Sequence, residues 1–318
     1  MGTMSATREA GSATKDPRRE RPGPAGAAAL LVAIRPKQWL KNLLVFAAPL
    51  AAGSLMQGPV IAGTLIAFVT FCLAASATYL INDIRDVDVD RLHPKKRFRP
   101  IASGRLRTRT AASVALVLMV VALAIAFWQS IGLGWTVLAY VASTLSYSLG
   151  LKHEPVLELL LLSLGFMLRA IAGGVATGIP LSQWFLIVAG FGSLFMAAGK
   201  RYSELNRLNG DGIDPSNGEQ GRRVLAGYTT AYLRFVVALA AGVTVTAYCL
   251  WAFEVGGAQV PPWSLISVFP FVLALMRYGA DIFRGEAETP ENAVLADKVL
   301  MAAGVVWMIT FGLGAVTA

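Results

Sequence analysis

The chain has 318 residues, of which 55% are hydrophobic and only 15% are charged. Soluble domains carry roughly 45–50% apolar and about 25% charged residues, so this composition excludes a disordered chain, a disulfide scaffold and almost any water-soluble globule. The excess of 28 Lys and Arg over 19 Asp and Glu gives a net charge of +9. Because the apolar residues fall in long runs, we predict an all-α polytopic protein of the lipid bilayer and expect no nucleic-acid partner.

The amino-terminal residues 1–28 are rich in Gly, Pro, Ala and charged side chains. Such a segment cannot bury enough apolar surface to fold by itself, so we predict a disordered cytoplasmic tail. The segment also lacks the continuous apolar core and small-residue cleavage site of a signal peptide. The remaining residues, 29–318, are predicted to form one transmembrane domain.

Nine membrane-spanning helices are predicted in this domain, because each crossing needs roughly 20 apolar residues. They are Trp39–Leu55, Val60–Ile81, Ala111–Phe127, Trp135–Leu149, Leu157–Thr177, Leu181–Ala198, Tyr232–Phe253, Trp263–Tyr278 and Val299–Ala318. All of the 28 basic residues except Arg169 lie in the amino-terminal segment, in the links after the even-numbered spans or at the adjoining helix ends. The positive-inside rule therefore places the amino terminus in the cytoplasm and the carboxyl terminus outside.

The cytoplasmic link at about 82–110 begins with a row of carboxylates. Asp83, Asp86 and Asp90 stand at i, i+3 and i+7, so a helix that continues from the second span puts all three on one face. Like charges so placed repel one another and require a counter-ion from outside the helix. Mg²⁺ is suited to the position, since it takes one or two carboxylates and keeps sites for substrate phosphates. The alternative is a solvated acidic patch that caps a membrane helix.

A basic cluster follows the carboxylates at once. Its members are Arg91, Lys95, Lys96, Arg97, Arg99 and Arg105. Such a cluster alone is explained by topology and by attraction to anionic lipid, worth about 1 kcal/mol per basic residue. Beside a carboxylate row, it indicates a polyphosphate site in which a metal bridges a diphosphate and the basic side chains neutralise the other oxygens.

A second long cytoplasmic link lies at about 199–231. Lys200, Glu204 and Arg207 share one helical face there, with Arg201 and Tyr202 beside them. A purely structural pairing of Lys200 with Glu204 contributes only about 0.2–0.5 kcal/mol. Together the two links are predicted to form a cytoplasmic cap.

Three more basic residues are candidates for the same membrane face. Lys37 and Lys41 lie one turn apart at the start of the first span. Arg169 lies inside the fifth span, where a charged side chain costs roughly 2.5–3.5 kcal/mol and marks a functional site by default. The alternative is that Arg169 lies near the end of the span and reaches the interface.

The acidic link resembles the first aspartate-rich motif of the UbiA superfamily of intramembrane transferases. The matching residues are Asn82-Asp83-x-x-Asp86-x-x-x-Asp90, followed by Arg99-Pro100-Ile101-x-Ser103-Gly104. The resemblance implies a bundle of nine transmembrane helices with a cytoplasmic cap, a Mg²⁺ cofactor and a cytoplasmic active site in the plasma (inner) membrane. It also allows a homo-oligomer.

One branch of this superfamily is similar in further positions, at Arg35-Pro-Lys-Gln-Trp-x-Lys-Asn42 and His93-Pro-x-Lys-x-x-Arg99-Pro100. The resemblance implies transfer of 5-phosphoribosyl from phosphoribosyl pyrophosphate to decaprenyl (polyprenyl) phosphate, with release of diphosphate, for cell-wall arabinan precursors. Most members of the superfamily carry a second aspartate-rich motif after the sixth span, whereas this chain has Lys200-Arg-Tyr-Ser-Glu204. Fewer carboxylates and more cations suit a donor with a third phosphate.

From these observations we expect Asp83, Asp86 and Asp90 to hold Mg²⁺ and, with Glu204, to serve in catalysis. The expected substrate-binding residues are Lys37, Lys41, Asn82, Lys95, Arg97, Arg99, Arg169, Lys200, Arg201 and Tyr202. The first alternative is an aromatic prenyltransferase of the same fold that binds a prenyl diphosphate. A transporter, the second alternative, would carry its ionisable residues near the bilayer midplane.

Overall fold

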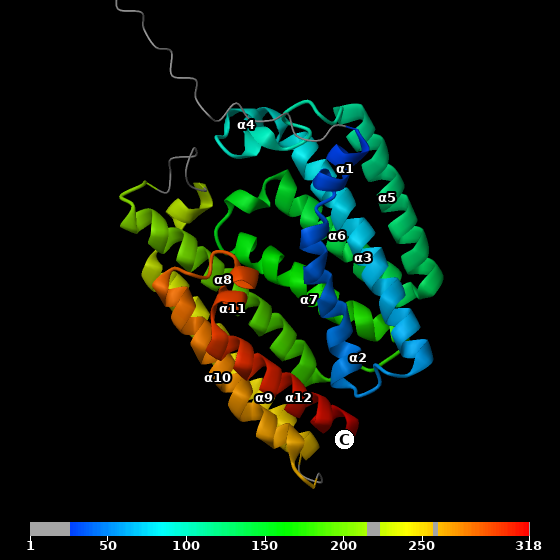
Figure 1. Cartoon of the computed structure of the whole chain (residues 1–318), viewed down its shortest axis with the longest axis vertical. Coiled ribbons are helices and arrows are strands. Elements are labelled where there is room, and N and C mark those ends of the chain that lie inside the picture. The colour runs from blue at the N-terminus through cyan, green and yellow to red at the C-terminus, as the bar shows by residue number, and fades with distance from the viewer. Residues whose placement is uncertain (1–25, 215–222, 257–259, 318) are drawn as a thin grey trace, which may run out of the picture.

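The computed structural model describes residues 26–214, 223–256 and 260–317, and these residues form helices and no strand. In chain order the elements are α1 (Ala27–Ala33), the 3-10 helix η1 (Pro36–Phe46), α2 (Ala47–Ala51), α3 (Gly58–Arg85), α4 (Val87–Leu92), η2 (Lys96–Phe98), α5 (Thr108–Gln129), α6 (Ile131–Leu149), η3 (Leu151–His153), α7 (Leu157–Thr177), α8 (Gln183–Gly210), η4 (Arg223–Gly227), α9 (Thr230–Gly256), α10 (Trp263–Arg284), α11 (Pro290–Ala296) and α12 (Lys298–Thr317). The long helices run between an end that carries α4 and the opposite end, toward which α12 descends (Figure 1).

Seven helices of the described chain are long and apolar enough to cross a membrane: α3, α5, α7, α8, α9, α10 and α12. The all-α polytopic fold is therefore confirmed, while the predicted count of nine spans is not. The predicted fourth span corresponds to α6, a 19-residue helix whose sequence includes Ser, Thr and Gly side chains. The predicted first span is not one α-helix.

The segment Trp39–Leu55 folds as the end of η1 followed by the five-residue α2. Pro36 opens η1 and Pro49 lies inside α2, and a proline lacks the N–H that a continuous α-helix needs. The turn that follows α2 contains Gly53, whose φ of 62° suits glycine. Glycine is also required there because the backbone of Ala315 on α12 leaves no space for a Cβ.

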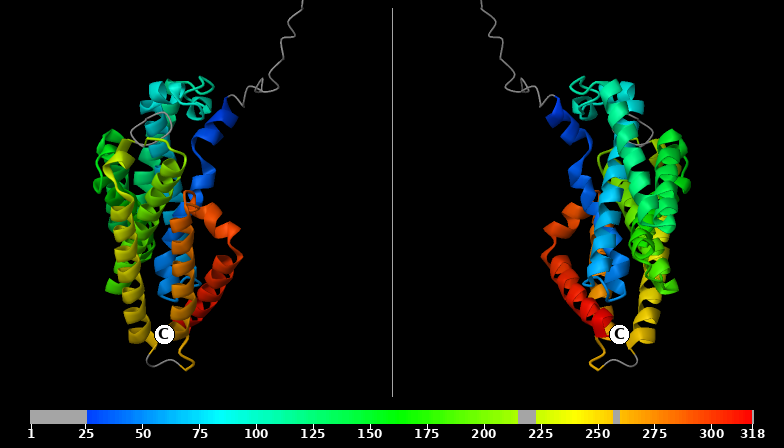
Figure 2. Two further views of the ribbon diagram at one scale, coloured as in Figure 1. Left: turned by 90° about the vertical axis from the view of Figure 1, so that its left-hand side faces the viewer. Right: turned by 90° about the vertical axis from the view of Figure 1, so that its right-hand side faces the viewer.

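The buried residues form two main cores on different sides of the molecule. One core joins α8, α9 and α10 through residues such as Phe195, Leu233 and Ile282. The other joins α3, α6 and α7 through residues such as Phe71 and Val137. Figure 2 shows these helices side by side along the long axis, with α12 inclined to the rest.

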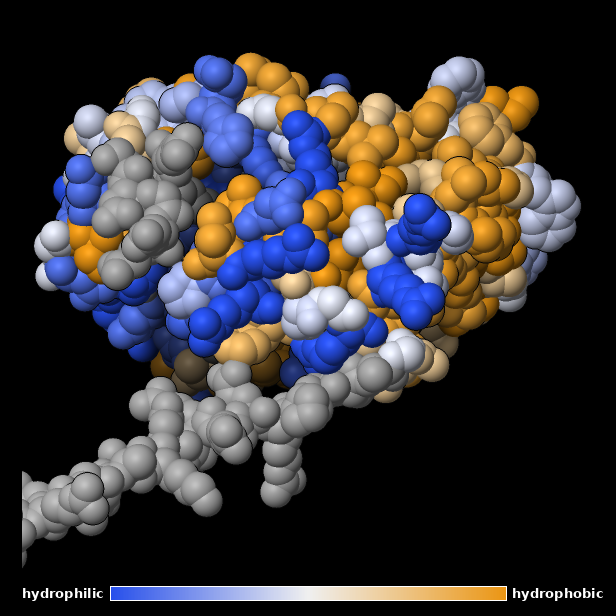
Figure 3. All heavy atoms as spheres, turned by 90° about the horizontal axis from the view of Figure 1, so that it is seen from above, coloured by the Kyte–Doolittle hydropathy of each residue, from blue (hydrophilic) through white to orange (hydrophobic). Residues whose placement is uncertain are grey.

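The outer surface is apolar around the bundle and polar at the α4 end. Leu116, Val117 and Val120 on α5 and Phe235 on α9 each expose more than half of their surface. Hydrophilic side chains gather across the α4 end, and hydrophobic ones form much of the rim (Figure 3). Exposed apolar surface of this extent is typical of a membrane-embedded protein.

The predicted cap lies at the polar end. The link at about 82–110 contains α4 and η2, and the link at about 199–231 begins as the last turns of α8 and ends with η4. Residues 215–222 of the second link lie outside the described residues, as do residues 1–25 of the predicted tail. The first described helix, α1, begins at Ala27, two residues before the predicted start of the transmembrane domain.

Candidate active site

A cavity of about 1690 Å³ lies inside the bundle and extends from the cap toward the opposite end. The part near the cap has polar walls from η1, α3, α4, η3 and α8. The far part is aromatic and is lined by Trp184, Tyr248, Trp251, Phe271, Trp307 and Phe311. A cavity with one charged end and one apolar end suits a reaction between a charged, water-soluble molecule and a lipid.

The carboxylates of the acidic link do not share one helical face, contrary to the sequence prediction. Helix α3 ends at Arg85, and Asp86 is its C-cap residue with φ −87° and ψ 8°. Asp86 and Asp90 line the cavity together with Asn82. Asp83, predicted as a metal ligand, is buried and is not part of the cavity wall.

Basic side chains from other segments neutralise each of these carboxylates. Arg35 donates from Nη2 to Oδ1 of Asp83 at 2.6 Å. Nη1 of Arg99 lies 3.2 Å from the same oxygen and 2.6 Å from Oδ2 of Asp90. The amine of Lys152 contacts both oxygens of Asp86 at 3.2 Å. The counter-ions expected from outside the helix are therefore present as protein side chains.

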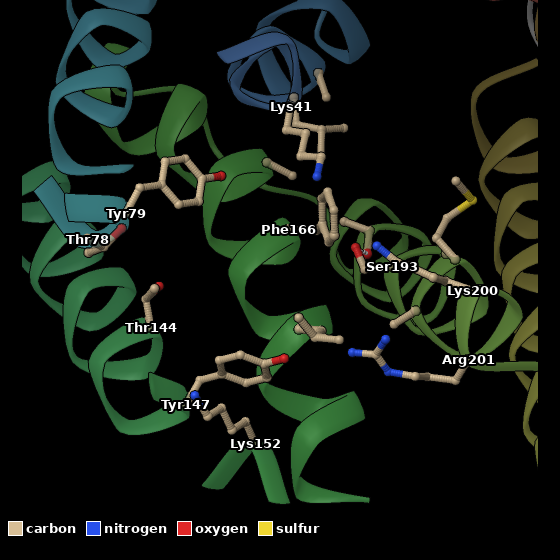
Figure 4. Close-up of a pocket in the computed structure, with 18 of the residues that line it drawn as sticks. Lys41, Thr78, Tyr79, Thr144, Tyr147, Lys152, Phe166, Ser193, Lys200 and Arg201 are labelled. Atoms are coloured by element: carbon tan, nitrogen blue, oxygen red, sulfur yellow. Dashed lines mark hydrogen bonds between the residues drawn. The ribbon is translucent and has the colours of Figure 1, made fainter. Parts of the chain in front are cut away.

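The opposite wall of the cavity is built by α8. Lys200 and Arg201 extend from α8 into the cavity, and Tyr147 on α6 reaches toward Arg201 from across it (Figure 4). Arg201 is only 1% exposed, and its Nε donates to Oε1 of Glu158 at 2.7 Å. Its Nη2 contacts the same oxygen, and its Nη1 donates to Glu204 at 2.5 Å. This network fixes the Arg201 guanidinium at the wall.

Seven of the residues predicted for the site line the cavity. They are Lys41, Asn82, Asp86, Asp90, Arg99, Lys200 and Arg201. Lys41 enters from η1, with its amine directed into the cavity (Figure 4). Besides Asp83, the predicted residues that do not line it are Lys37, Lys95, Arg97, Arg169, Tyr202 and Glu204.

The physical reason differs among the residues that stay outside the cavity. Lys37, Lys95 and Arg97 are exposed, and the Arg97 guanidinium lies 4.7 Å from the centre of the Phe98 ring. Tyr202 is buried, and its hydroxyl accepts a hydrogen bond from Arg234 at 3.1 Å. Glu204 supports the site indirectly through Arg201, as described above.

Arg169 is a buried structural residue. Its Nε donates to Oδ1 of Asn42 at 2.8 Å, its Nη1 to the carbonyl of Gly165 at 2.6 Å and its Nη2 to the hydroxyl of Tyr140 at 2.9 Å. It is 6% exposed, and its guanidinium also lies over the Tyr140 ring. The prediction that Arg169 binds substrate is therefore not supported by its position, since Arg169 does not line the cavity.

Sequence reasoning did not place Arg35, Lys152 or Glu158 at the candidate site. Arg35 and Lys152 line the cavity, and Glu158 accepts a hydrogen bond from Arg201. Arg35 entered the sequence analysis only as part of the motif that begins at Arg35-Pro-Lys, and Lys152 only as one of the basic residues that indicate topology. Glu158 had a usable signal, since an ionisable residue in an apolar segment marks a functional site. Its fully buried position and its bond to Arg201, 43 residues away, became visible only in the fold.

The donor set at the cavity wall fits a Mg²⁺ ion. Asn82, Asp86 and Asp90 supply oxygen atoms, which are the ligands that this hard cation prefers. Among the residues that the structure describes there is no preassembled group of three metal-ligating side chains. Mg²⁺ does not require one, because one or two carboxylates suffice when substrate phosphates complete its shell.

The turn that leads from α4 into the basic cluster depends on a neutral histidine. The Nδ1 atom of His93 accepts backbone N–H groups from Lys95 and Lys96 at 3.1 and 3.3 Å. Partial burial, followed by the charge of Lys96, lowers the pKa of His93 below its ordinary 6.5. Protonation of Nδ1 would remove this hydrogen-bond acceptor, so the turn depends on the neutral form of His93.

Comparison with known proteins identifies relatives of the whole domain. Residues 42–296 match the UbiA prenyltransferase family. The chain is 48% identical to the decaprenyl-phosphate phosphoribosyltransferase of Mycolicibacterium smegmatis, over 89% of this chain and 91% of that protein. It is 45% identical to the protein of the same name from Corynebacterium glutamicum, over 93% and 90% of the two chains.

The fold also has solved relatives. A UbiA homolog from Archaeoglobus fulgidus, bound to GPP and Mg²⁺, aligns with a TM-score of 0.63 at 18% identity, over 91% of this chain and all of that one. The same homolog bound to Cd²⁺ aligns with a TM-score of 0.63 at 16% identity. At such identities the likeness concerns the fold alone.

Proposed function

Because the chain belongs to the UbiA prenyltransferase family, we propose that it catalyses the reaction for which its 45–48% identical relatives are named. In this reaction a 5-phosphoribosyl group passes from phosphoribosyl pyrophosphate to decaprenyl phosphate, and diphosphate is released. The catalytic domain comprises residues 29–318. We place its α4 end at the cytoplasmic face of the plasma membrane, since hydrophilic side chains gather there (Figure 3) and the link that contains α4 and η2 carries the basic cluster.

The balance of charge on the cavity wall carries this proposal. Eight Lys and Arg side chains line the cavity against three Asp side chains. Phosphoribosyl pyrophosphate has a diphosphate and a separate 5-phosphate, whereas a prenyl diphosphate has the diphosphate only. An excess of cations beyond those that neutralise the carboxylates favours the donor with the additional phosphate.

We assign the diphosphate of the donor to the α3–α4 wall. Asp86 and Asp90, with the amide of Asn82, would hold Mg²⁺, and the bound ion would offset the negative charge that develops on the departing diphosphate. Lys152 lies 3.2 Å from Asp86 and is within reach of the same group. Because Lys152 and Asp86 form an ion pair, the amine is already held at the position where a phosphate oxygen must be neutralised.

We assign the 5-phosphate and the ribose to the α8 wall. Lys200 supplies an ammonium group, and Arg201 supplies a guanidinium that Glu158 and Glu204 hold in one orientation. A positioned guanidinium stabilises developing charge without having to reorganise during the reaction. The role of Glu204 is thus to orient Arg201.

We place the acceptor in the far part of the cavity and at η1. The aromatic walls around Trp307 and Phe311 are suited to an isoprenoid chain. The amine of Lys41 enters the cavity from η1 (Figure 4), and we assign it to the lipid phosphate. This arrangement brings the two reacting groups together at the boundary of the polar and apolar parts.

The chemical step is a single displacement at the anomeric carbon. An oxygen of the lipid phosphate forms a new bond to this carbon, and the carbon–oxygen bond to diphosphate breaks with its electron pair leaving on diphosphate. Inversion is the expected stereochemical outcome. A phosphate monoester is already ionised at neutral pH, so the protein contributes position and charge and needs no strong base.

Purified protein incubated with radiolabelled phosphoribosyl pyrophosphate and decaprenyl phosphate tests the proposal. Labelled lipid that appears only when Mg²⁺ and both substrates are present is the expected result. The second candidate is an aromatic prenyltransferase, which the name of the matched prenyltransferase family favours. Prenylation of an aromatic acceptor without any labelled sugar lipid would replace the first function with the second.

A further inference from the structure

The first aspartate of the acidic motif is placed differently from its neighbours. Asn82, Asp86 and Asp90 line the cavity, whereas Asp83 lies behind the wall with 2% of its surface exposed. Helix geometry explains the difference. Residues 82 and 86 are about one turn apart on one face, and residue 83 is turned by about 100° from residue 82.

Asp83 brings together two arginines from distant parts of the chain. Its Oδ1 accepts from Arg35 at 2.6 Å and from Arg99 at 3.2 Å, 48 and 16 residues away in sequence. Both arginines line the cavity, and their side chains are 29% and 27% exposed. Asp83 thus lies behind two guanidinium groups that face the cavity.

The backbone at Arg35 supports a positional role for this contact. Arg35 joins α1 to η1 with φ 53° and ψ 62°, in the left-handed region. That region is unfavourable for a residue other than glycine, and such strain persists where the surrounding contacts determine the conformation. The bond to Asp83 and the Tyr79 ring, 5.2 Å from the guanidinium, are those contacts.

Arg99 contacts two carboxylates, Asp83 and Asp90. Because Asp90 is expected to bind the ligand, Asp83 is the partner that remains for Arg99 in the bound state. Nη1 of Arg99 lies 2.6 Å from Asp90, which lines the cavity beside Asp86. Once Asp90 takes part in ligand binding, Asp83 is the partner that keeps Arg99 in place. A guanidinium has five N–H donors in a planar fork, so a bond to Asp83 leaves others for phosphate oxygens.

We propose that Asp83 is a positioning residue that aims Arg35 and Arg99 at phosphate oxygens of the donor, and is not a metal ligand. This inference rests on the proposed function for the identity of the donor. The carboxylates of this one motif therefore have different roles. Asp86 and Asp90 bind the metal, whereas Asp83 acts only by orienting the two arginines.

Calorimetric titration of the purified full-length chain in detergent tests this assignment. Phosphoribosyl pyrophosphate, and separately inorganic diphosphate, is titrated with and without Mg²⁺. We expect Asp83→Asn to weaken donor binding roughly ten- to hundredfold, as for loss of hydrogen bonds to charged groups. The ratio of the two Kd values, with and without Mg²⁺, should stay at the wild-type value. Asp86→Asn should move that ratio toward one.

A mutant cycle separates action through the arginines from a general structural effect. If Asp83 acts through them, Asp83→Asn adds little further loss in the Arg35→Gln/Arg99→Gln background. Full additivity, or collapse of the Mg²⁺ ratio in Asp83→Asn, would overturn the assignment. If Asp83→Asn does not fold, the double arginine variant decides, since it keeps Asp83 and should lose donor affinity at an unchanged Mg²⁺ ratio.

Arg284→Gln is the matched control. It removes an arginine from another buried aspartate, Asp281 on α10, away from the cavity, and donor binding should not change.

The titrations with inorganic diphosphate separate this inference from the proposed function. If the wild-type chain binds inorganic diphosphate but not phosphoribosyl pyrophosphate, the proposed function fails. The role of Asp83 is then judged from the diphosphate titrations alone. The mutant cycle needs no metal and remains decisive where Mg²⁺ has no effect.

Discussion

Replacement of Glu158 tests whether the buried pair with Arg201 supports both the fold and the site. Glu158 is fully buried and Arg201 is 1% exposed, so Glu158→Leu leaves a buried guanidinium with less compensation. Loss of one partner of a buried pair costs about 3–5 kcal/mol. Glu204 still holds Nη1 of Arg201, which places the expected loss near the lower limit, at about 3 kcal/mol.

Thermal unfolding in detergent measures this loss, and we expect a fall in Tm of about 5 °C for a chain of this length. Arg207→Gln is the matched control, because its partners Asp211 and Glu288 are at the exposed surface and exposed pairs contribute about 0–1 kcal/mol. The double variant Glu158→Leu/Arg201→Met should regain most of the stability, as buried pairs replaced by apolar side chains often do. It should stay inactive in phosphoribosyl transfer, since Arg201 is absent.

Two results would refute this reasoning. A Glu158→Leu variant as stable as Arg207→Gln would show that Arg201 needs no buried partner. A double variant that is both stable and active would remove Arg201 from the donor site. Each result is independent of the other, because the first concerns unfolding and the second concerns transfer.

Three further outcomes are expected. Lys152→Gln should raise the KM for phosphoribosyl pyrophosphate roughly ten- to hundredfold, and an unchanged KM would contradict its place beside the diphosphate. Arg169→Leu should lower the free energy of unfolding by about 1–3 kcal/mol, because Oδ1 of Asn42 loses its buried hydrogen-bond donor. If the folded variant instead shows a higher KM for either substrate, Arg169 belongs to the substrate site. Because the pKa of His93 is lowered in the folded chain, its contribution to stability is present above pH 6.5 and is lost as the pH falls through the lowered value. Tm should therefore fall between pH 7.5 and pH 5, and His93→Gln should show a smaller fall; an equal fall would refute the role of the neutral ring.

Hydropathy and charge position were sufficient to predict the long helices and the polar face, because both follow from residue type along the chain. The first predicted span, Trp39–Leu55, is not one α-helix, because its residues fold as the end of η1 followed by α2, where Pro49 lacks the N–H that a continuous α-helix needs. The carboxylate row was wrong in geometry for a similar local reason, the end of α3 at Arg85.

The partners of the site residues could not be predicted in the same way. Glu158 and Arg201 meet across 43 positions, and Lys152 and Asp86 across 66. One sequence without related sequences carries no signal for such pairs, because each depends on how helices pack in three dimensions. The sequence therefore predicted which links carry the chemistry, and the fold determined which side chains in them face the cavity.

The bond between Arg169 and Asn42 has a consequence for the acceptor side of the cavity. It joins the middle of α7 to η1, a segment that lacks the regular backbone of an α-helix. Lys41 is the residue next to Asn42, and its amine reaches the cavity. The buried Arg169 cation thereby anchors η1 against α7, and with it the backbone from which the Lys41 side chain enters the cavity.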